Sequence, residues 1–129
     1  MFDKLYLAAP DGTSWPLGLD TAEARLRERY PNAVMGRRTA NVSRRDYLSF
    51  DLLLNDAMRH GIYVDGGNLT LSDGTPADWA ETIAWFLSLL PAGTPVVALT
   101  EHNPQPTQVP PGTSADQVRT LLEGLIEAS

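Results

Sequence analysis

The alternation of apolar and polar residues between about 47 and 72 constrains the fold of this chain most strongly. Within it Leu48, Phe50, Leu52 and Leu54 occupy every second position, which is the period of a half-buried strand. A three-residue loop at 55–57 and a two-residue turn at Gly66-Gly67 then bring the apolar positions of three successive strands onto one face. The pattern predicts an antiparallel meander over about residues 47–72.

This register puts His60 opposite Leu52, on the core face, where we expect a neutral imidazole with one hydrogen-bond partner. The same stretch also fits a helix that begins after Ser43 and ends at Gly61. We favour the meander because a slip of one residue would invert every face of the three strands. The helix stays open as the alternative for residues 44–60.

Three helices are expected to pack on the sheet, over about residues 21–30, 76–90 and 114–127. Asp20 is a suitable N-cap for the first helix, and Pro31 ends it. Thr75 and Pro76 begin the second helix, and Thr113 begins the third. The fold class is therefore α+β, a mostly antiparallel sheet with helices packed on it.

The remaining segments fit this arrangement. Short strands are expected over residues 5–9, 14–17, 33–39 and 95–100, and a loop with four prolines over 101–112. A chain of 129 residues has the size of one globular domain, so we expect a single domain over residues 1–129.

Charge is divided unevenly along the chain. There are 10 basic and 16 acidic residues, and the formal net charge is −6. Seven arginines lie between Arg25 and Arg45, whereas residues 61–129 contain eight acidic residues and one basic residue, Arg119. The overall negative sign disfavours nucleic acid as a partner, because that affinity comes mainly from neutralising phosphates. The sequence alone leaves the arginine segment without an assigned function.

Several classes of protein are excluded or disfavoured by composition. The absence of cysteine excludes disulfide scaffolds and thiolate zinc sites, and it fits a reducing cytoplasm. No apolar run approaches the roughly 20 residues of a membrane span. The first residues lack the basic and apolar regions of a secretory signal. We expect a cytoplasmic protein without membrane contact.

Glu101 and His102 are the candidates for chemistry. They follow an expected buried strand, where functional groups often collect, and His102 could act as a base oriented by Glu101 or Asn103. No nucleophile motif, metal-ligand spacing or glycine-rich phosphate loop accompanies them. We therefore expect neither catalysis, nor a metal, nor a cofactor.

A binding surface is the stronger expectation. Trp85 and Leu89 lie off the main apolar face of the second helix, so they could contact a partner or a second copy of the chain. Nearby acidic residues suit a basic partner, and two arginines suit an anionic one. These charged candidates are Asp73, Asp78, Glu81, Arg37 and Arg38.

The function expected from these observations is non-enzymatic binding of a basic protein partner. An adaptor would fit, as would a protein of the physical type of toxin-neutralising immunity proteins, although no shared motif supports that comparison. The alternative is a small enzyme or ligand-binding domain that holds an anionic small molecule with His102, Glu101 and nearby arginines. An arrangement of those groups around one pocket would favour the enzyme or ligand-binding domain, and a scattered arrangement would favour the binding protein.

Overall fold

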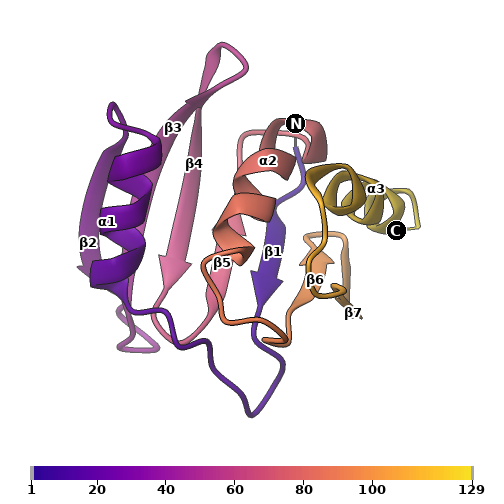
Figure 1. Cartoon of the computed structure of the whole chain (residues 1–129), viewed down its shortest axis with the longest axis horizontal. Helices are drawn as coiled ribbons and strands as arrows, with labels where there is room; N and C mark the ends of the chain where they lie inside the picture. Colours follow the sequence, from indigo (N-terminus) through magenta and orange to yellow (C-terminus); the bar gives the residue numbers. More distant parts are fainter. Residues whose placement is uncertain (1, 129) are drawn as a thin grey trace.

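The fold is α+β, as the sequence predicts. The computed structural model describes residues 2–128, which form a seven-stranded antiparallel sheet and three helices (Figure 1). The strands are β1 (Leu5–Ala8), β2 (Val34–Thr39), β3 (Asp46–Leu54), β4 (Ala57–Val64), β5 (Asn68–Leu71), β6 (Val97–Thr100) and β7 (Asn103–Gln108). The helices are α1 (Leu19–Arg29), α2 (Pro76–Leu87) and α3 (Ala115–Glu127).

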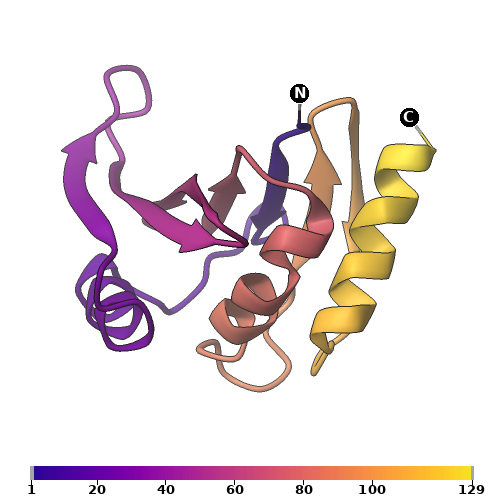
Figure 2. The same ribbon diagram turned by 90° about the horizontal axis from the view of Figure 1, so that it is seen from above.

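The strand order across the sheet is β2-β3-β4-β5-β1-β6-β7. The first strand thus lies between β5 and β6, so that the two ends of the chain belong to the same half of the sheet. All three helices lie on one side of the sheet, α1 toward β2 and α3 toward β7 (Figure 2). Within residues 2–128 no helix covers the other face, and none is long and apolar enough to cross a membrane.

Local sequence explains where the helices begin. Thr75 accepts a hydrogen bond from the Asp78 backbone, and the Asp78 carboxylate accepts one from the Thr75 backbone, which is a capping box. Ser114 and Gln117 form the same motif at α3, so Ser114 is its cap rather than the expected Thr113. Helix α1 begins after Gly18, two residues earlier than Asp20 would place it.

Two segments differ from the sequence-based expectation. Residues 14–17 form no strand; instead Trp15 and Leu17 are buried in the core. The proline-rich segment expected to be a loop contains β7, which pairs with β6 at the edge of the sheet. Pro104 and Pro106 lie in this edge strand, where the pairing with β6 is irregular between Ala98 and Thr100. Edge positions are where a strand tolerates proline.

The meander over about residues 47–72 is confirmed, but β4 is shifted by one residue from the predicted register. A two-residue turn, Asn55-Asp56, joins β3 to β4, and both residues have positive φ, 49° and 65°. This is the turn geometry that matches the twist of a hairpin. Leu52 consequently lies opposite Arg59, and Phe50 lies opposite Gly61.

The shift turns His60 away from the core, which corrects the prediction that it is buried there. The core positions of β4 are Arg59, Gly61 and Tyr63. Gly61 leaves room for the Phe50 ring, and the Arg59 side chain is satisfied by carbonyl groups beneath the sheet. A polar and a small residue can therefore occupy positions that an apolar pattern would assign to larger side chains.

Candidate functional site

The Glu101-His102 pair forms the turn between β6 and β7, and the fold brings Asp3 beside it. Asp3 stands just before β1, which runs antiparallel to β6. His102 Nδ1 lies 2.9 Å from Asp3 Oδ1, and Glu101 Oε1 accepts the Lys4 backbone N–H at 3.2 Å. One ligand atom from each of Asp3, Glu101 and His102 lies within 4.8 Å of the other two.

Asp3, rather than Glu101 or Asn103, is the partner that orients His102. The Asn103 side chain instead donates to the backbone carbonyl of Leu125 in α3. The His102 side chain is 67% exposed, so a reaction there would take place in bulk water. A hollow of about 340 Å³ adjoins Asp3, but His102 does not line it. The site offers ligands and hydrogen bonds to an ion, without an enclosed chamber for a substrate.

Arg37 and Arg38 lie in β2 at the opposite end of the sheet. Five strand spacings separate β2 from β6, roughly 24 Å at about 4.8 Å each. Arg37 bridges Asp20 and Glu23 of α1, and these two carboxylates raise its pKa. In turn Arg27 and Arg37 lower the pKa of Glu23 by hydrogen bonding to it. Arg37 is therefore occupied within the fold.

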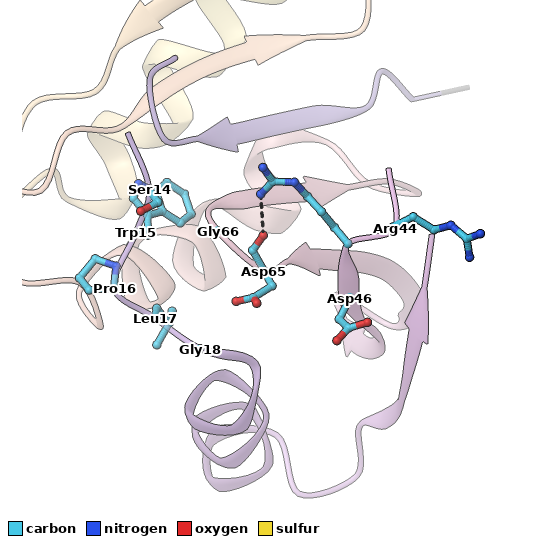
Figure 3. Close-up of a pocket in the computed structure, with 10 residues that line it drawn as sticks. Ser14, Trp15, Pro16, Leu17, Gly18, Arg44, Asp46, Asp65 and Gly66 are labelled. Atoms are coloured by element: carbon cyan, nitrogen blue, oxygen red, sulfur yellow. Dashed lines mark hydrogen bonds between the residues drawn. The ribbon is translucent and has the colours of Figure 1, made fainter. Parts of the chain in front are cut away.

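Arg44 and Arg45 border a hollow at one end of the sheet (Figure 3). Gly18, which directly precedes α1, lines the same hollow. The hollow encloses about 490 Å³. Arg45 donates to the Asp65 backbone carbonyl at 3.1 Å, the contact marked by the dashed line, while Arg44 points away. Asp46 and Asp65 line the same hollow, so two acidic side chains offset the arginines there. The arrangement favours no ion of either sign.

Asp78 belongs to a buried network around Arg59. The Arg59 side chain is 9% exposed and donates to the carbonyls of Leu54 and Asp73 at 2.8 and 2.6 Å. Its guanidinium also lies 3.3 Å from Asp78, whose side chain is 14% exposed. A hydrogen bond from Asn55, followed by those from Thr75, lowers the pKa of Asp78. Asp78 thus fastens α2 to the β3–β4 turn.

Asp73 and Glu81, by contrast, are exposed on either side of this network. Within residues 2–128 neither carboxylate forms an ion pair or a side-chain hydrogen bond. Asp73 contributes only its backbone carbonyl to Arg59. The two carboxylates are therefore free to act on a partner.

Trp85 and Leu89 are half-buried. The Trp85 ring meets the Tyr30 ring edge-on at 6.0 Å, and the Arg29 guanidinium lies 5.2 Å from its centroid. Trp85 therefore joins α2 to the end of α1, and only part of its surface is left for another molecule. Its contact with Arg29 is a cation–π interaction.

The second histidine, His60, lies on the helix-free face of the sheet. Its Nδ1 is 2.9 Å from Asp51 Oδ1, the same pairing that His102 makes with Asp3. His60 is in β4 and His102 in the β6–β7 turn, so the two histidines do not share a site. The contact between Asp3 and His102 could not be predicted from the sequence, because no local pattern indicates that two segments 99 residues apart are neighbours.

Comparisons with known proteins give no further assignment. No protein-family model matches the chain. Searches of curated proteins and of solved structures likewise find no match.

Proposed function

We propose that this chain is a cytoplasmic, non-enzymatic binding protein whose acidic surface docks on a basic protein partner. The observation that carries the proposal is a set of carboxylates on and near α2 and α3 that form no ion pair within the described residues. Arg25, Arg27 and Arg37 have carboxylate partners on α1, whereas the carboxylates of Asp73 and Glu81 form no ion pair within the described residues. Uncompensated charge of one sign attracts a partner of the other.

The spatial layout supports the same reading. Helix α1 and β2, which contain most of the arginines, lie at one end of the molecule, and α3 and β7 lie at the other (Figure 1). In α3 the side chains of Asp116 and Glu127 form no ion pair within residues 2–128. The molecule is thus electrostatically polar, and a basic partner is attracted to the side formed by α2 and α3.

The arrangement gives little support to an enzyme acting on an anionic small molecule. That alternative needs His102, Glu101 and arginines around one ligand. His102 is roughly 24 Å from β2 by strand spacing, and Arg37 is already bound by Asp20 and Glu23. A single small molecule cannot span that distance.

The proposal is tested by affinity capture from the native cell extract with three matched baits. The baits are the wild-type protein, Asp73→Asn with Glu81→Gln, and Asp11→Asn with Asp65→Asn. The third bait loses the same charge from exposed loops at the other end of β4. A basic protein retained by the first and third baits and lost from the second supports the proposal. Equal retention by all three baits contradicts it.

A further inference from the structure

The side chains of Asp3, Glu101 and His102 form a set of three metal-ligand groups that the function proposed above does not use. Backbone pairing holds the two segments together. Leu5 and Thr100 are partners in the β1–β6 ladder, and Glu101 N–H donates to the Lys4 carbonyl at 3.0 Å beyond it. The sheet thus fixes the positions from which all three side chains extend.

We propose that Asp3, Glu101 and His102 bind a divalent transition-metal ion of the zinc class. An ion about 2.0–2.2 Å from each ligand atom holds these atoms roughly 3–4 Å apart. The three atoms already lie within 4.8 Å of one another, so a modest rotation of the side chains brings them to the separation that an ion requires. Glu101 and His102 are exposed and have the space to rotate.

The donor set selects the class of ion. An imidazole nitrogen suits zinc, cobalt, nickel and copper, whereas calcium prefers six to eight oxygen ligands and this site has only two carboxylates. Two carboxylates neutralise the charge of a divalent ion. Water completes the coordination on the exposed side, so the expected affinity is moderate.

The surroundings add to the attraction for a cation. Glu123 and Glu127, from the last turns of α3, line the hollow that adjoins Asp3. Arg119 neutralises Glu123 at 3.1 Å, while Glu127 forms no ion pair within the described residues. An ion held here links Asp3 to the β6–β7 turn, and binding to the folded state alone stabilises that state.

The other histidine provides a matched control. His60 and Asp51 make the same contact, 2.9 Å between Nδ1 and Oδ1, on another part of the sheet. Among the described residues no third ligand group joins that pair. If a histidine–aspartate pair were sufficient, both places would bind the ion. The proposal requires a third ligand group, the Glu101 carboxylate, and predicts binding only at His102.

The test uses full-length protein without an affinity tag, treated with chelator and titrated with zinc chloride by calorimetry. Cobalt(II) titration, read by visible absorption, reports coordination independently. We expect one zinc per chain with micromolar affinity, weakened by about tenfold or more in His102→Ala, Asp3→Asn and Glu101→Gln. The controls, His60→Ala and Asp51→Asn, should bind as the wild type does.

Two results overturn the proposal. One is wild-type affinity weaker than about 1 mM, which would mean adventitious contact only. The other is an equal loss in the His60→Ala and His102→Ala proteins. Circular dichroism without metal checks that each variant folds. If a variant does not fold, the wild-type stoichiometry and cobalt spectrum still decide the outcome.

Discussion

The ring of Phe50 lies over Gly61, its partner on the neighbouring strand. A Cβ atom on Gly61 would stand 2.3 Å from Phe50 Cε2 and 2.4 Å from Cζ, far inside van der Waals contact. Phe50 is buried, and a close-packed core offers its ring no empty space. The ring therefore occupies the space that a side chain at residue 61 would need.

We expect Gly61→Ala to lower the free energy of unfolding by about 1–3 kcal/mol, because the added methyl group displaces Phe50. Urea denaturation measures the change. Gly36→Ala is the control, since the nearest atom to its Cβ, Ser49 Oγ, is 3.8 Å away in ordinary contact. Adding Phe50→Leu to Gly61→Ala should recover part of the loss. Equal effects of the two alanines would show that steric overlap is not the cause.

We expect Asp78 to make the stability of the fold depend on pH in the acid range. Hydrogen bonds, first that from Asn55, hold the pKa of this carboxyl below its usual value of about 3.8. A carboxyl with a lower pKa in the folded state stabilises above the unfolded pKa, and that contribution is lost as the pH falls. Asp78→Asn should be less stable than the wild type at pH 7 by about 1–3 kcal/mol. The difference should shrink between about pH 5 and pH 3.

Urea denaturation at several pH values tests this prediction. Glu81→Gln removes a carboxylate from the exposed side of the same helix and should leave the stability at pH 7 within about 0.5 kcal/mol of the wild type. A constant difference between Asp78→Asn and the wild type down to pH 3 would contradict the linkage.

We expect Tyr63 to make the stability of the fold depend on pH in the alkaline range. Its hydroxyl donates to the Leu17 carbonyl at 2.6 Å, and burial, with a smaller effect of the Asp65 charge, raises its pKa to about 12. The folded protein holds the Tyr63 proton to a higher pH than the unfolded chain does. Its contribution to the free energy of unfolding is therefore complete below about pH 10 and declines from there to pH 12. The decline is about 1.4 kcal/mol for each unit by which the pKa is raised.

Tyr63→Phe should remove that decline and also lower stability at pH 7 by about 1–3 kcal/mol, because the Leu17 carbonyl loses its donor. Urea denaturation from pH 7 to pH 11 measures both effects. The spectrophotometric titration of the folded variant should lack a late-titrating tyrosine. An alkaline decline as steep as that of the wild type would assign it to other groups.

Local patterns were sufficient for the meander and for all three helices, because periodicity and capping residues act over a few neighbouring positions. They were insufficient for the face of β4. Met58, Ile62 and Val64 make its outward face the more apolar one, so an apolar count selects the wrong side. The turn at Asn55-Asp56 and the buried contacts of Arg59 decide the register instead.

The same limit applies to the sites. Glu101 and His102 were identifiable from their place after a strand, but Asp3 was not, because its proximity depends on β1 pairing with β6. The sequence around Asp78 predicts a surface carboxylate, but its side chain is largely buried beside Arg59. In both cases the missing information is a contact between segments distant in sequence, which periodicity does not encode.

The proposed docking surface makes a kinetic prediction. Asp73 and Glu81 are exposed and unpaired within residues 2–128, whereas neutralising Asp78 would disturb the fold; the informative variant is Asp73→Asn with Glu81→Gln. Charges at the border of an interface act mainly during approach, so this variant should slow association with a basic partner more than it speeds dissociation. The difference in association rate between the variant and the wild type should diminish as salt screens the attraction, since the Debye length falls from about 10 Å at 0.1 M to about 3 Å at 1 M.

Surface plasmon resonance over a salt series measures both rates. Asp11→Asn with Asp65→Asn, the same charge change at the other end of β4, should leave the association rate near that of the wild type. An association rate independent of salt and of both charge changes would exclude electrostatic steering by this surface.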